Sequence, residues 1–136
     1  MIKIILADDS PVLIDGIQSN LKNEPNIKII GTANNMEELL NLLEKTTPDL
    51  LIMEVKLGDE EGFVTAKMIL EKYPEIRIVF FTHYESNVIV KKSFSIGAKA
   101  CLLKNLSNEE FIYSIKMAHR GEVDFFYKKK QFARQN

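Results

Sequence analysis

The sequence predicts a single α/β domain in which a doubly wound parallel sheet is covered by helices on both faces. Short runs rich in Ile, Leu, Val and Phe alternate with longer segments whose apolar residues recur at helical spacing. Gly, Pro, Asn and Ser stand at many of the boundaries, where turns and helix caps are expected. A length of 136 residues suits one domain, which buries roughly two thirds of its unfolded surface.

Five short apolar runs are expected to form strands that are covered on both faces, because they are continuously apolar instead of alternating. They are residues 3–7, 27–33, 49–53, 76–82 and 100–103. A helical segment separates each strand from the next, so the connections are expected to be right-handed crossovers and the strands parallel.

Five segments carry the helical pattern. They are a helix from Pro11 through Leu21, residues 36–45, 63–72 and 86–96, and a helix from Ser107 to near Gly121. Ser10 suits the N-cap of the first helix, and Pro11 suits its first turn, where a missing N–H costs nothing. Ser107 and Glu110 form an S-x-x-E capping box.

Composition and charge argue against several classes of protein. The chain is 46% apolar and 27% charged, and no apolar run approaches the roughly 20 residues that a membrane span requires. The apolar run at the amino terminus ends in two acids, unlike a secretory signal, so a cytoplasmic location is expected. Residues 1–121 contain 14 Lys and Arg against 17 Asp and Glu, which does not favour a nucleic-acid-binding surface.

Chemically capable side chains follow the predicted strands. In a doubly wound sheet the ligand site lies at the carboxyl ends of the strands. The sequence places there the acids Asp8, Asp9 and Glu54, the hydroxyl of Thr82 and the amine of Lys104. Three carboxylates in one place need a cation to offset their charge, and Mg²⁺ prefers such oxygen ligands. A metal, a lysine and a hydroxyl around one acidic acceptor are what phosphoryl transfer requires.

Four segments resemble the response-regulator receiver domain of two-component systems. They are "ADDSP", "PDLLIMEVKLGDEEG", "FFTHYES" and "GAKACLLKN", in the family's order and at its separations. The resemblance covers residues 2–121 and implies a flavodoxin-like sheet with strand order 2-1-3-4-5 and five helices. The last quarter is most similar to the subfamily with a C-terminal helix-turn-helix (LuxR-type) output domain. Residues 1–121 are therefore expected to be the receiver, and residues 122–136 a linker or tail toward an output domain that this chain lacks.

The resemblance also implies the ligands of a magnesium site. Asp9 would ligate Mg²⁺ directly and Asp8 largely through water. The side chain of Glu54 and the backbone carbonyl of Lys56 would complete the set of protein ligands.

The same resemblance implies a switch and its partners. Thr82 and Lys104 would contact the phosphoryl group. The donor would be a sensor histidine kinase, a homodimer is a possible assembly, and DNA would be reached only through an output domain. The family catalyses only its own phosphoryl transfer and dephosphorylation, so the chain is not expected to be an enzyme in the usual sense.

Glu54 departs from the family, whose phosphoacceptor is aspartate. The extra methylene moves the carboxylate by about 1.5 Å, and a misplacement of 1 Å costs on the order of a hundredfold in such reactions. We therefore expect inefficient phosphorylation. Two explanations stay open: Glu54 is a phosphoryl mimic, natural or engineered, or the chain is a pseudo-receiver driven by partner binding. A mimic would be partial, because a carboxylate carries one charge where a phosphoryl group adds about −1.5 to −2.

Cys101 is a second departure, because the family usually places Tyr or Phe there as a ring that follows the state of Thr82. The only cysteine of the chain cannot form an internal disulfide, and it is expected to be a buried core residue.

Other interpretations remain open for the same residues. A Mg²⁺-dependent phosphohydrolase could use the acids as a plain metal cluster, although no glycine-rich phosphate loop is present. A purely structural interaction module would need no metal, and the same acids, hydroxyl and lysine could also be ordinary helix-start, strand-end and loop residues. The acids at 59–61 are expected to form a solvated turn, and the basic tail "FFYKKKQFARQN" a linker or an interaction arm.

Overall fold

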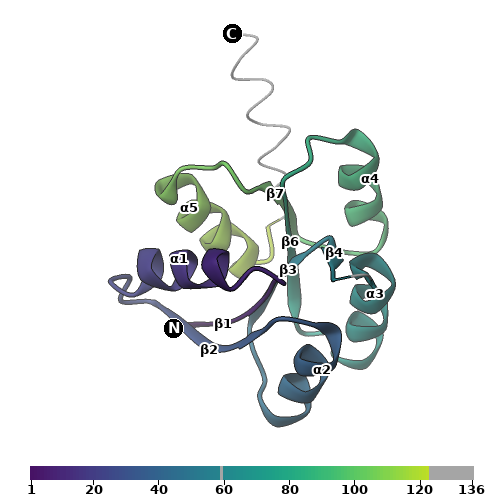
Figure 1. Ribbon diagram of the computed structural model, residues 1–136, viewed down its shortest axis with the longest axis horizontal. Helices are drawn as coiled ribbons and strands as arrows, with labels where there is room; N and C mark the ends of the chain where they lie inside the picture. Colours follow the sequence, from purple (N-terminus) through teal and green to yellow (C-terminus); the bar gives the residue numbers. More distant parts are fainter. Residues whose placement is uncertain (59, 123–136) are drawn as a thin grey trace, which may run out of the picture.

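A parallel five-stranded sheet forms the centre of the protein (Figure 1). The computed structural model describes residues 1–58 and 60–122. The strands are β1 (Ile2–Ala7), β2 (Ile27–Ala33), β3 (Leu50–Glu54), β6 (Arg77–Thr82) and β7 (Ala100–Leu103). They lie in the order β2-β1-β3-β6-β7, which is 2-1-3-4-5 when these five strands are counted along the chain. The predicted fold class is confirmed.

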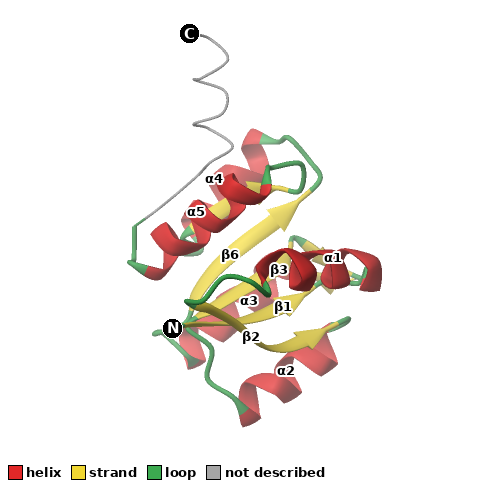
Figure 2. Cartoon of the chain, turned by 90° about the vertical axis from the view of Figure 1, so that its left-hand side faces the viewer, coloured by secondary structure: helices red, strands yellow, loops and turns green. Residues whose placement is uncertain are grey.

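Helices cover both faces of the sheet (Figures 1 and 2). On one face lie α1 (Pro11–Leu21) and α5 (Asn108–His119), and on the other lie α2 (Met36–Lys45), α3 (Gly62–Lys72) and α4 (Asn87–Ser95). Successive strand side chains point to opposite faces, so neighbours such as Phe80 and Phe81 enter different halves of the core. None of the helices in the described ranges combines the length and apolarity that crossing a bilayer would need.

The predicted helix caps are present. The Ser10 hydroxyl accepts a hydrogen bond from the Leu13 N–H (3.2 Å), with Pro11 as the first residue of α1. The Ser107 hydroxyl accepts from the Glu110 N–H (3.1 Å), and the Glu110 carboxylate accepts from the Ser107 N–H (2.9 Å). Both motifs can be recognised from sequence because they depend on local backbone donors.

The segment after β3 contains a short hairpin that the sequence analysis did not predict. Strand β4 (Lys56–Leu57) pairs antiparallel with β5 (Glu60–Glu61), and Gly58 has a φ of +64° between them. Asp59 lies outside the described residues, and the interpretation of its neighbours Glu60 and Glu61 as part of a simple solvated turn was incomplete. Two-residue strands carry too little hydrophobic pattern to be recognised from sequence.

Gly62 begins α3 where the hairpin returns to the sheet. Its N–H donates to the Val55 carbonyl (2.7 Å), and a Cβ at this position would lie 2.5 Å from that oxygen and 2.8 Å from the Glu54 carbonyl oxygen. Only glycine fits without a shift of the backbone that carries Glu54.

We predict that Gly62→Ala lowers the free energy of unfolding by about 1–3 kcal/mol, the usual cost of inserting a methyl group into filled space. Urea denaturation would measure it. Gly16→Ala is the matched control, because nothing lies within 4 Å of a Cβ there, and removing a helical glycine should stabilise by roughly 0.5–1 kcal/mol. Equal effects at both positions would contradict the steric argument.

Candidate functional site

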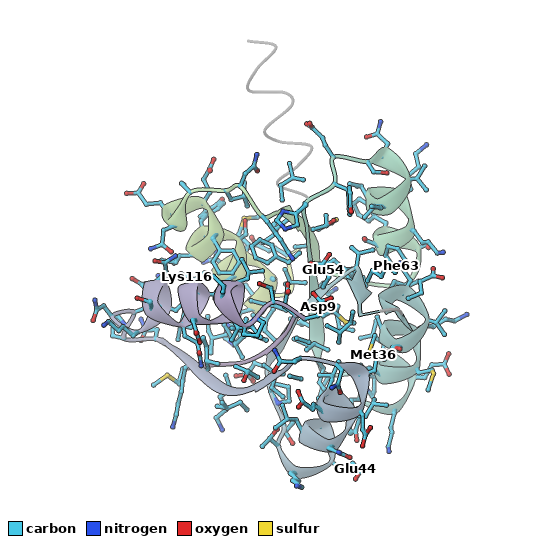
Figure 3. All side chains as sticks on the ribbon, in the orientation of Figure 1. Asp9, Met36, Glu44, Glu54, Phe63 and Lys116 are labelled. Atoms are coloured by element: carbon cyan, nitrogen blue, oxygen red, sulfur yellow. The ribbon has the colours of Figure 1, made fainter. Side chains whose placement is uncertain are left out.

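The side chains expected to carry the chemistry lie at the carboxyl edge of the sheet. Glu54 is the last residue of β3 and Thr82 the last of β6, whereas Asp8 and Lys104 directly follow β1 and β7. The parallel register aligns these ends, because Ala7 pairs with Met53, Glu54 with Phe81 and Thr82 with Leu103. Figure 3 labels Asp9 and Glu54 at this edge.

Asp8 is buried and held from several sides. One carboxylate oxygen, Oδ1, accepts a hydrogen bond from the Ser10 N–H (2.9 Å), and the other, Oδ2, accepts from the Lys104 ammonium (2.7 Å). Its N–H donates to the Ala33 carbonyl (3.0 Å), and its carbonyl accepts from the Asn34 side-chain amide (3.3 Å). Both carboxylate oxygens therefore already have protein partners.

Lys104 links the two buried acids. Its ammonium forms ion pairs with Asp8 and with the Oε2 atom of Glu54, and only 5% of its side chain is exposed. The N–H of Lys104 donates to the Thr82 carbonyl (2.8 Å), which fixes the start of the loop relative to β6. The ammonium also lies 5.8 Å from the centre of the Phe81 ring. One positive charge is thus shared by two carboxylates in a nearly dry site.

The environment perturbs the protonation of this group of side chains. Burial raises the pKa of Glu54, the ion pair with Lys104 opposes that rise, and the nearby charge of Asp8 adds to it. Burial alone would lower the pKa of Lys104, but its hydrogen bonds and ion pairs with Asp8 and Glu54 outweigh burial, so the pKa lies above its ordinary value. Lys104 is therefore held as a cation.

Thr82 belongs to the same edge but not to the same network. Its side chain is buried, and its hydroxyl accepts a hydrogen bond from the N–H of Tyr84 (3.1 Å), a residue that is 67% exposed. Within the described residues the Thr82 hydroxyl makes no hydrogen bond to Glu54. The structure thus brings Glu54 to Lys104 but leaves Thr82 engaged in its own loop.

Asp9 and Lys56 are the expected metal ligands that Lys104 does not contact. The side chain of Asp9 is exposed and makes no hydrogen bond or ion pair with any described residue. In the hairpin, Lys56 lies opposite Glu61, and the hydrogen bond from the Gly62 N–H to the Val55 carbonyl joins the next pair of residues. Hydrogen-bonded and non-hydrogen-bonded pairs alternate in an antiparallel ladder, so the backbone N–H and carbonyl of Lys56 face away from β5.

These oxygen donors suit a hard divalent cation in chemical type. Among residues 1–58 and 60–122, however, no three His, Cys, Asp or Glu side chains gather into a group that could hold a metal ion. Asp8 and Glu54 already share the ammonium of Lys104, so a cation held by Asp9 would have to draw oxygens away from that ammonium to gain more carboxylate ligands.

Cys101 is buried in the core of the α2–α3–α4 face, where its backbone pairs with Phe80. Burial raises the pKa of its thiol to about 11, and a hydrogen bond from Ser93 opposes the rise. The expectation of a buried core cysteine is confirmed. That Cys101 occupies the family's switch-aromatic position stays a prediction.

We predict that Cys101 reacts slowly with a thiol reagent such as DTNB at pH 8 in the folded chain, because the thiolate is the reactive form and little of it is present. In a denaturant that unfolds the chain, the same thiol should react at the rate of a free cysteine. Absorbance at a single wavelength follows both reactions. Rapid labelling of the folded chain would show that the thiol is accessible.

Two contacts at the site were missed by the sequence analysis. The amide of Asn34 reaches the carbonyl of Asp8 from the end of β2, and the N–H of Ser10 donates to the Asp8 carboxylate. The contact from the Ser10 N–H could have been predicted, because an Asp side chain often accepts a hydrogen bond from the backbone two residues later. The contact from Asn34 depends on β2 lying beside β1 in the sheet, and nothing local in the sequence indicates it.

Comparisons with known proteins identify the family of the chain. The model of the response regulator receiver domain family matches residues 4–116. The uncharacterized transcriptional regulatory protein YxjL of Bacillus subtilis is 31% identical over 124 residues, which are 91% of this chain and 57% of that protein. The transcriptional regulatory protein LnrK of the same organism is 26% identical over 121 residues, 89% of this chain and 55% of that protein. The chain thus spans little more than half the length of these relatives.

A solved structure shows the same fold. A two-component response regulator of the LuxR family from Aurantimonas sp. SI85-9A1 superposes with a TM-score of 0.85 at 24% identity, covering 90% of this chain and 88% of that one. The fold, the acidic edge with its lysine and threonine, and the family match over most of the chain lead to one conclusion: this chain belongs to the response regulator receiver domain family of two-component systems.

Proposed function

We propose that this receiver is held in a partly switched form by Glu54, which occupies the phosphoacceptor position. The observation that carries the proposal is the ion pair between Glu54 and the buried ammonium of Lys104. Glutamate reaches the lysine that would otherwise contact a phosphoryl oxygen, yet the Thr82 hydroxyl stays bonded to the loop. Glu54 therefore makes one of the two contacts expected of a phosphoryl group, the contact with Lys104, and lacks the contact with Thr82. A partial mimic with two oxygens and one charge would behave in this way.

Phosphorylation of Glu54 itself is expected to be inefficient. Its carboxylate is extended by one methylene, about 1.5 Å, and its Oε2 atom already meets the ammonium of Lys104. A carboxylate in contact with a cation is a weaker nucleophile than a free one, because attack would have to break that ion pair. Both effects act against in-line attack on a phosphoryl donor.

We further propose that Mg²⁺ is the cation of this edge. Asp9 would ligate it directly, Asp8 through water, and Glu54 and the Lys56 carbonyl would complete the protein ligands. The ion, when bound, supplies charge that neutralises phosphoryl oxygens. The support is chemical: Asp9 is exposed and unpaired among the described residues, and the position of Lys56 in the hairpin turns its backbone away from β5.

The partners and the domain division are proposals of the same kind. Residues 1–121 would be the receiver and residues 122–136 a connection toward an output domain. The tail from residue 123 lies outside the described residues. The donor would be a sensor histidine kinase, and the output would be transcription, as the names of the relatives YxjL and LnrK indicate for those proteins. A homodimer is a further possibility for the assembly.

A pseudo-receiver that is driven by partner binding is the second candidate. One observation favours it: Lys104 already pairs with both Asp8 and Glu54 without any phosphoryl group. In that case the Glu54 form would be the only functional form, and restoring aspartate would not restore a response to phosphorylation.

The test compares the chain with its Glu54→Asp variant, each incubated with acetyl phosphate and Mg²⁺ and analysed by intact-protein mass spectrometry. Label on the variant alone supports a receiver with an altered phosphoacceptor. Absence of label on both supports the pseudo-receiver. A parallel incubation with ATP addresses the hydrolase interpretation, which steady turnover of nucleotide by the unmodified chain would favour.

A further inference from the structure

We propose that Lys104 is a built-in counter-ion that competes with divalent cations, so that this receiver binds Mg²⁺ at the acidic edge more weakly than its carboxylates alone would. The inference rests on the proposed function, because it concerns the same edge, but it predicts a property that phosphorylation does not measure: the affinity of the chain for Mg²⁺.

The first step concerns the position of the ammonium. Lys104 Nζ lies 2.7 Å from Asp8 Oδ2 and also contacts Glu54 Oε2, with the lysine and aspartate side chains 5% and 6% exposed and that of Glu54 9%. The ammonium therefore already contacts one oxygen of each of the two buried carboxylates that a metal would use.

The second step concerns length. Glutamate carries its carboxylate about 1.5 Å further than aspartate, and in this chain that carboxylate meets the ammonium of Lys104 directly. The longer side chain thus favours the contact with the lysine, which directly follows β7, two strands away from β3 in the sheet. The departure at position 54 and the engagement of Lys104 are two parts of one arrangement.

The third step concerns charge. Asp8 and Glu54 carry two negative charges, and Lys104 offsets one of them within the buried site. A divalent cation that approached these oxygens would meet the ammonium within a few ångströms, where like charges repel strongly at the low effective dielectric of a buried site. Binding would require Lys104 to leave, and the ion would otherwise keep only Asp9 and backbone oxygen.

The experiment measures Mg²⁺ binding by isothermal titration calorimetry at fixed ionic strength. The unmodified chain is compared with Lys104→Gln, which removes the ammonium and keeps a similar length. Lys92→Gln is the matched control, since Lys92 also pairs with a carboxylate (Glu61, 2.8 Å) but at an exposed position on α4.

We expect Lys104→Gln to bind Mg²⁺ at least about tenfold more tightly than the unmodified chain, because the competing charge is gone. Lys92→Gln should bind like the unmodified chain. Equal affinities of Lys104→Gln and the unmodified chain overturn the proposal, and so does the absence of binding to either. Neither result depends on whether Glu54→Asp can be phosphorylated, so this proposal can fail while the proposed function stands.

A second measurement covers the case in which Lys104→Gln does not fold without metal. Recovery of its folded signal on addition of Mg²⁺ would support the competition. In the unmodified chain, the ammonium resonance of Lys104 can be followed by ¹H–¹⁵N NMR during a Mg²⁺ titration. The proposal requires that resonance to shift or exchange away when the ion binds, and an unchanged resonance at saturating Mg²⁺ overturns it.

Discussion

Glu54→Asp is expected to take up a phosphoryl group from acetyl phosphate and Mg²⁺ on the order of a hundredfold faster than the unmodified chain. The shorter side chain withdraws the carboxylate by about 1.5 Å and so loosens its ion pair with Lys104. The carboxylate then lies where in-line attack on the phosphoryl donor is expected. Initial rates of mass increase, measured on the intact protein, give the ratio.

Two further variants separate position from general effects. Glu54→Gln keeps the volume but lacks the nucleophilic charge, and it should remain unlabelled. Glu61→Asp makes the same chemical change at an exposed residue of the neighbouring hairpin, and it should label no faster than the unmodified chain. Labelling of Glu54→Asp at the rate of the unmodified chain would refute the assignment of position 54 as the phosphoacceptor.

Lys104→Gln is expected to lower the free energy of unfolding by about 3–5 kcal/mol in magnesium-free buffer at pH 7, the usual result of leaving buried charges without their partner. Two carboxylates, Asp8 and Glu54, would lose the one ammonium that they share. Urea denaturation measures the difference. Lys92→Gln breaks an exposed ion pair and should change stability by no more than about 1 kcal/mol.

The loss should depend on pH in a defined direction. Burial raises the pKa of Glu54 and the contact with Lys104 lowers it, so removal of the lysine lets the pKa rise further. The folded variant then binds a proton at a pH where the unfolded chain does not, and its stability increases as the pH falls through the folded pKa. The deficit of Lys104→Gln relative to the unmodified chain should therefore shrink between pH 7 and pH 5. A constant deficit would show that packing, and not charge, causes it.

Much of the fold could be predicted because it depends on local rules. The caps at Ser10 and Ser107 use donors within three residues, and the strand at 100–103 is continuously apolar, as a doubly covered strand requires. The short hairpin of β4 and β5 escaped prediction because two residues carry no period, and Gly58 alone does not specify a turn type. Boundaries also moved by a residue, so that Glu54 ends β3 instead of following it.

The composition of the site could be predicted better than its pairing. The rule that ligands gather at the carboxyl ends of parallel strands correctly brings Asp8, Glu54 and Lys104 to one edge. It does not specify which oxygen the ammonium meets, because that depends on side-chain length and on competing donors such as the Ser10 N–H. The direction of the Thr82 hydroxyl was equally beyond sequence, since it is decided by the backbone of the loop that follows.

The hydrogen bond between Thr82 and Tyr84 has a mechanical consequence. The hydroxyl accepts this bond from the backbone N–H of Tyr84, a largely exposed residue, so an inward movement of Thr82 would also move the backbone that carries Tyr84. The Glu54 carboxylate contacts the ammonium of Lys104 and makes no hydrogen bond to the Thr82 hydroxyl, so it does not draw the threonine inward. Tyr84 therefore keeps its position until another group accepts a hydrogen bond from the Thr82 hydroxyl. The surface around Tyr84 would be the first part of the molecule to change when that bond forms.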